Sequence, residues 1–188
     1  ISHDGEFWQF DDMRLQLRSY QTPRLPLAIA TAGNDESLEL AAKHGMILMS
    51  LVGKNMVRHG TQADHWAKYT AFADKHNVTA SRDNWRMVTS VYLAETAAEA
   101  RADVAEGIMR ETGYFSSIGL KFMYESTPGQ PFSEFTPESC AETREWIIGT
   151  PDDAIAWIEA RQKLTGGFGG MMLTTHEWAR TDKLRRSM

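Results

Sequence analysis

Short apolar runs of strand length alternate with longer segments of helical spacing along most of this chain, and this alternation restricts the fold more than any other feature. The apolar runs cover residues 26–31, 46–52, 85–94 and 171–175. Helical patterns follow each of them. Strands that alternate with helices are typical of a parallel sheet covered by helices. The length of 188 residues suits one domain, with enough chain to bury a substantial core.

Helix boundaries are marked most clearly in the second half of the chain. Thr150 and Pro151 predict a helix start, because threonine caps the free N–H groups and proline fits the first helical position. This helix is expected to reach about Leu164. The polar segment 176–188 is expected to form a terminal helix. The positions that we expect it to bury are Ile155, Trp157, Ile158 and Leu164.

Two glycine-containing segments are harder to interpret. Residues 112–135 predict a short helix near 115–124 and then a loop. This loop is more easily explained as an ordinary surface loop than as a lid over a binding site. The glycines at 166–170 come before a strand, and no Gly-Lys-Ser/Thr follows them. They therefore predict a turn and not a phosphate-binding P-loop.

Two architectures fit the alternation. Four strand–helix units are half of an eight-fold barrel, which takes ~250 residues, and a small doubly wound sheet fits as well. In both, ligands bind beyond the carboxyl ends of the strands. The segments of interest therefore follow Thr31, Ser50, Glu95 and Thr174, of which Glu95 shows no specific chemistry beyond preceding a helix cap.

The segment Thr31-Ala32-Gly33-Asn34-Asp35-Glu36-Ser37 combines a strand end, a turn of small residues and a helix start. Free N–H groups and the positive end of a helix dipole can hold a phosphate at such a place. The plainer interpretation is a helix cap, with Asn34 as the capping residue. Asp35 and Glu36 would repel a phosphate unless they point away.

For the other candidate residues, a purely structural role is an alternative to a functional one. His176 follows a strand end beside Trp178, and it is either a ligand-facing residue or a hydrogen-bonded capping histidine. Cys140 has no evident base beside it and is expected to be an idle thiol. Met46, Met49, Met171 and Met172 are either core residues or part of an apolar pocket wall.

Composition excludes several classes. The 20 basic and 25 acidic residues give a net charge of −5, which argues against a nucleic-acid partner. The apolar runs are far shorter than the ~20 residues of a membrane-spanning helix. The six histidines show no metal-binding spacing, so no metal site is expected. The single cysteine favours a reducing compartment, and hence a cytoplasmic location.

A set of segments along the chain carries a family resemblance. They are Leu15-Gln16-Leu17-Arg18, Tyr20-Gln21-Thr22-Pro23, residues 25–30, Ala41-Ala42-Lys43-His44-Gly45, residues 148–154, residues 165–170 and His176-Glu177-Trp178-Ala179. Together these segments resemble the C-terminal half of luciferase-like flavin-dependent monooxygenases, and most of all their limonene monooxygenase-like branch. They span nearly the whole chain. Each is weak alone, and their combination is fairly specific.

The resemblance implies the C-terminal part of a (β/α)8 TIM barrel, with about four βα units. It implies an enzyme that inserts one oxygen atom from O2 into a small apolar substrate, with reduced FMN supplied by a partner flavin reductase. A deazaflavin is the possible alternative cofactor, and a non-catalytic flavin-binding protein or a deazaflavin-dependent oxidoreductase is the alternative function.

The resemblance also implies roles for individual residues. Those matching the flavin-phosphate segment of the family are Thr31, Ala32, Gly33, Asn34 and Ser37. Met49 and Ser50 match the strand that borders the isoalloxazine ring, and His176 and Trp178 match positions near the substrate. No catalytic residue can be assigned.

The matching positions begin after the middle of the family's barrel. We therefore expect residues 1–188 to form a single domain that is a fragment, the C-terminal half of the barrel. Half a barrel leaves two open strand edges, expected at 26–31 and 171–175, and an uncovered apolar face. Such a chain should form a homo-oligomer or pair with a missing N-terminal half.

Overall fold

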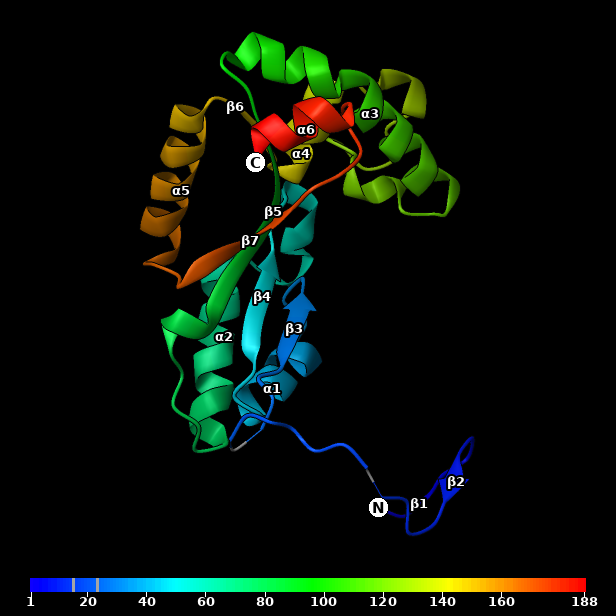
Figure 1. Cartoon of the computed structure of the whole chain (residues 1–188), viewed down its shortest axis with the longest axis vertical. Coiled ribbons are helices and arrows are strands. Elements are labelled where there is room, and N and C mark those ends of the chain that lie inside the picture. Colours follow the sequence, from blue (N-terminus) through cyan, green and yellow to red (C-terminus); the bar gives the residue numbers. More distant parts are fainter. Residues whose placement is uncertain (15, 23) are drawn as a thin grey trace.

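A parallel sheet forms the centre of the molecule (Figure 1), in a computed structural model that describes residues 1–14, 16–22 and 24–188. Its strands are β3 (Ala28–Thr31), β4 (Ile47–Leu51), β5 (Trp85–Leu93), β6 (Ile147–Gly149) and β7 (Gly170–Thr174). β4 lies between β3 and β5, β7 pairs along most of β5, and β6 pairs with its C-terminal end. The four predicted strands are confirmed. β6 was not predicted, because three residues carry no readable period.

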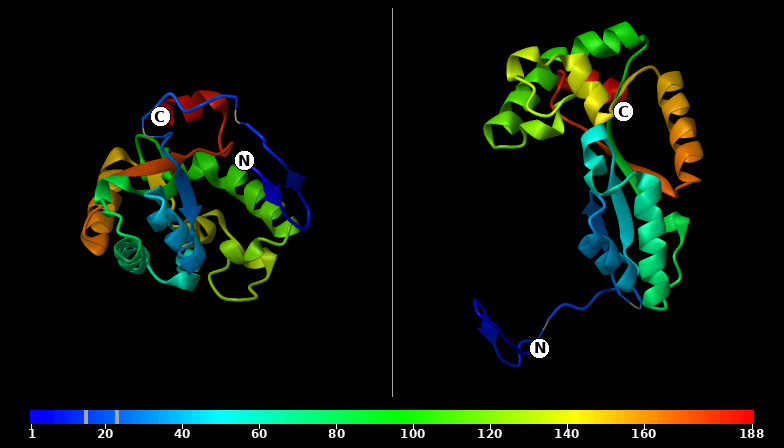
Figure 2. Two further views of the ribbon diagram at one scale, coloured as in Figure 1. Left: turned by 90° about the horizontal axis from the view of Figure 1, so that it is seen from below. Right: turned by 180° about the vertical axis from the view of Figure 1, so that it is seen from behind.

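Helices follow the strands as the alternation predicts. They are α1 (Asp35–Lys43), α2 (Gln62–Lys75), α3 (Ala97–Ser117), α4 (Pro137–Arg144), α5 (Pro151–Thr165) and α6 (Thr181–Ser187), with short 3-10 turns at Lys54–His59, Arg82–Asn84, Lys121–Met123 and Phe132–Glu134. Figures 1 and 2 show α1 and α2 along one part of the sheet, and α3, α4 and α6 gathered beyond the C-terminal end of β5. None of the helices in the described ranges is long and apolar enough to cross a membrane.

One face of the sheet is covered by helices. On this face Leu48, Trp85 and Met87 are 0% exposed and pack with α1 and α2 into an apolar core. Side chains alternate along a strand, so the neighbours of these residues point to the other face. There Ala30 and Met172 are exposed and Met49 is half-buried. One face is therefore a closed core, and the other remains open.

Three strands have a free edge within the described chain. β3 pairs only with β4, and β6 and β7 each pair only with β5. This confirms the edges expected at 26–31 and 171–175. The open face and the two edges are what half of a barrel should show.

The N-terminal segment lies apart from the sheet. β1 (His3–Asp4) and β2 (Gln9–Phe10) form a small antiparallel hairpin, which projects from the body in Figure 2. Phe7 and Trp8 near its turn are 80% and 75% exposed. Leu15 and Pro23, which belong to segments that carry the family resemblance, lie outside the described residues.

Three expectations about the helices are wrong. No separate helix covers 115–124, because α3 continues through Gly113 to Ser117 and a 3-10 turn follows at Lys121–Met123. The terminal helix begins only at Thr181 instead of near 176. Ile155 and Leu164 are 54% and 60% exposed, because α5 faces the body with Trp157, Ile158, Arg161 and Thr165.

Candidate functional site

The loop after β3 is built as a helix cap with a left-handed glycine. Thr31 is buried, and its hydroxyl accepts a hydrogen bond from Gly33 N at 2.9 Å. Gly33 has φ of +93°, a conformation that side chains rarely adopt. Asn34 caps α1 by accepting from Ser37 N at 3.0 Å. The N–H groups of Asp35 and Glu36, which precede Ser37 in the first turn of α1, have no intrahelical acceptor, so they remain available to an anion.

The acidic residues of this loop do not block such a site. Lys68 on α2 forms an ion pair with Asp35, with Nζ and Oδ1 2.8 Å apart. Its Nζ also donates to the carbonyl of His59 at 3.2 Å. Asp35 is thus drawn toward α2 and its charge is partly offset, and Glu36 is exposed. The repulsion expected from the sequence is therefore reduced by a partner 33 residues away along the chain.

A second helix start lies beside the first. Thr61 caps α2 through a complete capping box with Asp64. His65, one turn into α2, is fully buried against the loop, and a Cβ placed on Gly33 would collide with His65 Nε2. Glycine is required at position 33 for both its backbone conformation and its contact with this ring. The structure brings Thr31, Ala32, Gly33, Asn34 and Ser37 together with the N-terminal turns of two helices.

Met49 and Ser50 lie on opposite faces of β4. Met49 lies on the open face, beside Ala30 and Arg86 in the strand register. Ser50 lies in the closed core, where its hydroxyl accepts a hydrogen bond from Trp85 Nε1 at 2.9 Å. Met49 is thus placed where a planar ligand could lie on the sheet. The Ser50 side chain points to the opposite face of the sheet, where Trp85 is its hydrogen-bond partner.

His176 and Trp178 form a stacked pair after β7. Their ring centroids are 4.8 Å apart with an interplanar angle of 8°. His176 Nδ1 lies 2.9 Å from Glu111 Oε2, and Trp178 Nε1 donates to the same oxygen at 2.6 Å. Gly107 permits this contact, since any Cβ there would collide with the Trp178 backbone. The two residues are held together as predicted, with Glu111 on α3 as their anchor.

A hydrogen-bond chain links this pair to the open face of the sheet. His176 Nε2 lies 2.9 Å from Ser90 Oγ, which lies 2.7 Å from Thr174 Oγ1. Ser90 and Thr174 are register partners on β5 and β7. Glu111 also accepts from Tyr124 OH at 3.0 Å. The chain Thr174–Ser90–His176–Glu111 therefore runs from the sheet to a buried carboxylate.

Glu111 remains a carboxylate in this setting. Burial by itself would raise its pKa, but the hydrogen bond and charge of His176, with the bonds from Trp178 and Tyr124, outweigh burial and lower the pKa. The same burial and the neighbouring carboxylate raise the pKa of Tyr124. Glu111 can therefore orient the His176 ring as a fixed negative charge.

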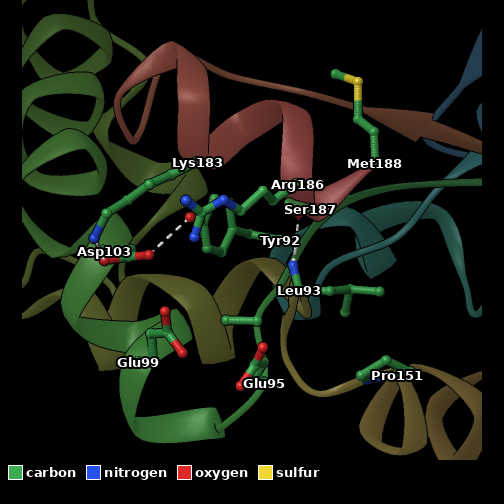
Figure 3. A pocket seen from close by; sticks show the side chains of 11 residues that line it. Tyr92, Leu93, Glu95, Glu99, Asp103, Pro151, Lys183, Arg186, Ser187 and Met188 are labelled. Carbon is green, nitrogen blue, oxygen red and sulfur yellow. Dashed lines mark hydrogen bonds and ion pairs between the residues drawn. The ribbon is translucent and has the colours of Figure 1, made fainter.

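A cavity of about 430 Å³ opens at the end of β5, beside the Glu95 segment (Figure 3). Tyr92 OH donates to Asp103 at 2.9 Å, and Lys183 of α6 forms an ion pair with the same carboxylate. Leu93 N donates to Ser187 Oγ at 2.7 Å, which ties α6 to the strand. This strand end, in which the sequence indicated no chemistry, thus has a polar cavity closed by α6.

Two other predictions concern reactive groups. Cys140 is fully buried, and burial raises the pKa of its thiol, in agreement with an idle thiol. Among the described residues no group of His, Cys, Asp and Glu could hold a metal ion.

The sequence did not single out His65, Lys68, Ser90 or Glu111. Each lies on a helix or strand where its residue type is ordinary, and its importance comes from a partner far along the chain. One weak signal existed for Glu111, a carboxylate in a segment rich in apolar and small residues.

Comparison with known proteins places this geometry in a family. The model of the family described as luciferase-like monooxygenase matches residues 1–166. The chain is 27% identical to 4-hydroxyprotoasukamycin monooxygenase of Streptomyces nodosus subsp. asukaensis, over 100% of this chain and 50% of that protein. It is 28% identical to limonene 1,2-monooxygenase of Rhodococcus erythropolis, over 96% of this chain and 45% of that protein.

A solved structure agrees with the fold. The oxygenating constituent of 3,6-diketocamphane monooxygenase from the CAM plasmid of Pseudomonas putida, in complex with FMN, matches with a TM-score of 0.66 and 18% identity. The match covers 95% of this chain and 52% of that one. The chain thus spans about half the length of the curated relatives it matches, and the expected partial barrel is confirmed. Because the family model matches residues 1–166 of this chain, the chain belongs to the luciferase-like monooxygenase family.

Proposed function

We propose that this chain supplies the flavin-phosphate half of a luciferase-like flavin-dependent monooxygenase. The complete enzyme inserts one oxygen atom from O2 into a small apolar substrate and receives reduced FMN from a flavin reductase. The observation that carries the proposal is the loop 31–37, where two helix starts meet at the C-terminal end of β3. The structural relative with FMN supports the choice of cofactor.

The residues present fit a flavin phosphate. The N–H groups of Asp35 and Glu36 lie in the first turn of α1 without an intrahelical acceptor, the left-handed Gly33 turns the loop against His65, and the Ser37 hydroxyl donates no hydrogen bond within the described part of the chain. Thr31 shapes the loop from below. Bound reduced flavin would supply the electrons with which O2 is split, one atom going to the substrate and the other to water.

The open face of the sheet would form one wall of the reaction site. Met49, Val88 and Met172 lie on this face by strand register, and Thr174 follows at its end. This apolar wall would hold the flavin ring and exclude water. His176 lies at the rim with its side chain 30% exposed, so it would face the substrate with Trp178 stacked behind it.

The other wall of the site is not formed by the described strands. The free edges of β3 and β7 and the exposed Ala30 and Met172 leave the barrel open on this side. We propose a complementary N-terminal half as the partner that closes it, with a second copy of this chain as the alternative.

FMN titration tests the proposal directly. The six tryptophans report binding by fluorescence, and native mass spectrometry counts flavins per 21.2 kDa chain. We expect saturable binding of FMN, and its loss in Gly33→Val, whose side chain would collide with His65. Circular dichroism of the variant controls for folding. Absence of saturable binding by the wild type would refute the proposal.

Turnover separates the catalytic function from the alternatives. Reduced FMN, O2 and a small terpene are incubated with the chain, and product is compared with a flavin-only control. Product above the control supports a monooxygenase. FMN binding without product favours a non-catalytic flavin-binding protein, and binding of a deazaflavin in preference to FMN favours the deazaflavin-dependent oxidoreductase.

A further inference from the structure

His65 is a buried polar residue of the candidate site, and no structural role is apparent for its ring nitrogens. Its residue is 0% exposed, and neither ring nitrogen has a hydrogen-bond partner in the described structure. An unpaired buried polar group costs roughly 1–3 kcal/mol, so it calls for a physical explanation. A phenyl ring would fill the same space without that cost.

The ring is aimed at the anion-binding loop. Nε2 is the atom that a Cβ on Gly33 would meet first, so the imidazole occupies the space that a side chain at position 33 would fill. Gly33 directly precedes Asn34, the cap of α1. His65 lies only one turn from the start of α2. The unpaired nitrogen and the two helix N-termini thus converge on one place.

The groups that face this ring leave it neutral. Burial lowers its pKa. The Gly60 backbone, which lies near the ring without reaching hydrogen-bond geometry, and the charge of Asp64 partly offset this lowering. Lys68 on α2 and His59 in the preceding turn also lower the pKa. Asp35 on α1 is already paired with Lys68. A neutral imidazole still carries one N–H that it can donate to an oxygen.

We propose that His65 is a phosphate-specific residue of this site, which donates a hydrogen bond to the terminal phosphate of a bound flavin mononucleotide and takes up a proton when that phosphate binds. The proposal rests on the proposed function, since it names a determinant of the same site. A dianion beside the ring stabilises the imidazolium, so the pKa of His65 rises in the complex. A ligand without phosphate offers neither effect.

The comparison of FMN with riboflavin tests this role, because the two differ only in the phosphate. Calorimetric titrations use the wild type, His65→Phe, His65→Gln and the control His76→Gln. His76 lies at the other end of α2, bonded to Glu39. We expect the wild type to prefer FMN. In His65→Phe, the affinity for FMN should fall ~10–100-fold, the effect of losing a hydrogen bond to a charged group. Riboflavin affinity should change less than ~2-fold in the same variant, since riboflavin carries no phosphate.

Proton uptake gives an independent readout. Titrations of FMN in two buffers of different ionisation enthalpy should show uptake near neutral pH for the wild type and reduced uptake for His65→Phe. Affinity for FMN should increase as the pH falls from 8 toward ~6, where the phosphate itself begins to protonate. His65→Gln should retain part of the preference for FMN and lose the proton uptake, because an amide donates but does not titrate.

Three outcomes would overturn the proposal. Equal loss of FMN and riboflavin binding in His65→Phe would show a packing role. Unchanged FMN affinity would show that the loop binds phosphate without His65. A wild type that binds FMN no more tightly than riboflavin would show no phosphate site.

Failure of the proposed function is recognised separately. If neither flavin binds the wild type, inorganic phosphate is titrated while the His65 ring is followed by NMR. A saturable shift of the ring resonances would support the phosphate role without a flavin, and no shift would overturn it. His65→Phe should also be at least as stable as the wild type without ligand, because it removes an unpaired polar group.

Discussion

The two faces of the sheet come from the same strands and differ in almost every respect. On the face toward α1 and α2, Leu48, Trp85 and Met87 are fully buried, and the buried Ser50 hydroxyl is hydrogen-bonded to Trp85. On the opposite face, Met172 is 45% exposed and Met49 half-buried. The first face is completed by helices adjacent in sequence. The second requires a surface that these helices cannot supply.

This difference separates stability from function. A closed core makes the strand–helix units stable as a group, since burial of apolar side chains is the main favourable term in folding. In parallel barrels, ligands bind at the carboxyl ends of the strands, where the open face meets the loops that follow them. Substitutions on the first face should therefore change the free energy of unfolding, and those on the second should change association and binding.

The largest contrast is expected between two apolar substitutions. Trp85→Ala should lower the free energy of unfolding by about 3–5 kcal/mol, because it removes a buried ring and leaves a cavity. Met172→Ala on the open face should change it by less than about 0.5 kcal/mol. Urea unfolding followed by circular dichroism measures both. Equal effects would show that the open face is a second core.

The carboxylate that anchors His176 and Trp178 should be the next most sensitive position. Glu111→Ala removes the acceptor for three donors, so we expect a loss of about 2–4 kcal/mol in urea unfolding. The folded pKa of Glu111 is lowered, so its stabilisation is complete above its unfolded pKa of about 4.3 and disappears as the pH falls through the folded pKa. Glu111→Gln should therefore weaken the acid dependence of stability, and an unchanged dependence would contradict this role.

Association should depend on the free edges. The wild type is expected to form concentration-dependent oligomers in sedimentation velocity, because β3 and β7 present unpaired edges. Leu173→Lys places a charge on β7 and should weaken association ~10-fold or more, as charged residues protect natural edge strands. Ile155→Lys, at a position equally exposed on α5, is the matched control. Equal effects of the two variants would place the contact elsewhere.

The smallest effect is expected at the helix cap of the loop. Asn34→Ala removes the hydrogen bond to Ser37 N and should cost about 1 kcal/mol of stability. FMN affinity should fall modestly, since the loop loses its preorganised shape. Asn34→Asp retains the cap, so its stability should match the wild type, while its charge should weaken FMN binding. FMN bound equally well by Asn34→Asp would argue against a phosphate at this loop.

Much of the fold was predictable because its signals are local. The runs at 26–31 and 46–52 are apolar except for Thr31 and Ser50, as the strands of a parallel sheet often are, and Thr150 with Pro151 marks the start of α5. β6 was missed for its shortness. Ile155 and Leu164 were misplaced because the apolar pattern of α5 does not reveal that Arg161 takes a buried position beside Gln62 and Glu145.

By itself the sequence determined the alternation of strands and helices, the helix caps and the segment 31–37, since periodicity and capping depend on residues a few positions apart. The family resemblance came from the same local segments. Only the tertiary structure decided which side chains meet. It set His65 against Gly33, Lys68 against Asp35, and Glu111 against His176, because these contacts join residues that are 32, 33 and 65 positions apart. The candidate site depends on such distant pairs, which no local pattern encodes.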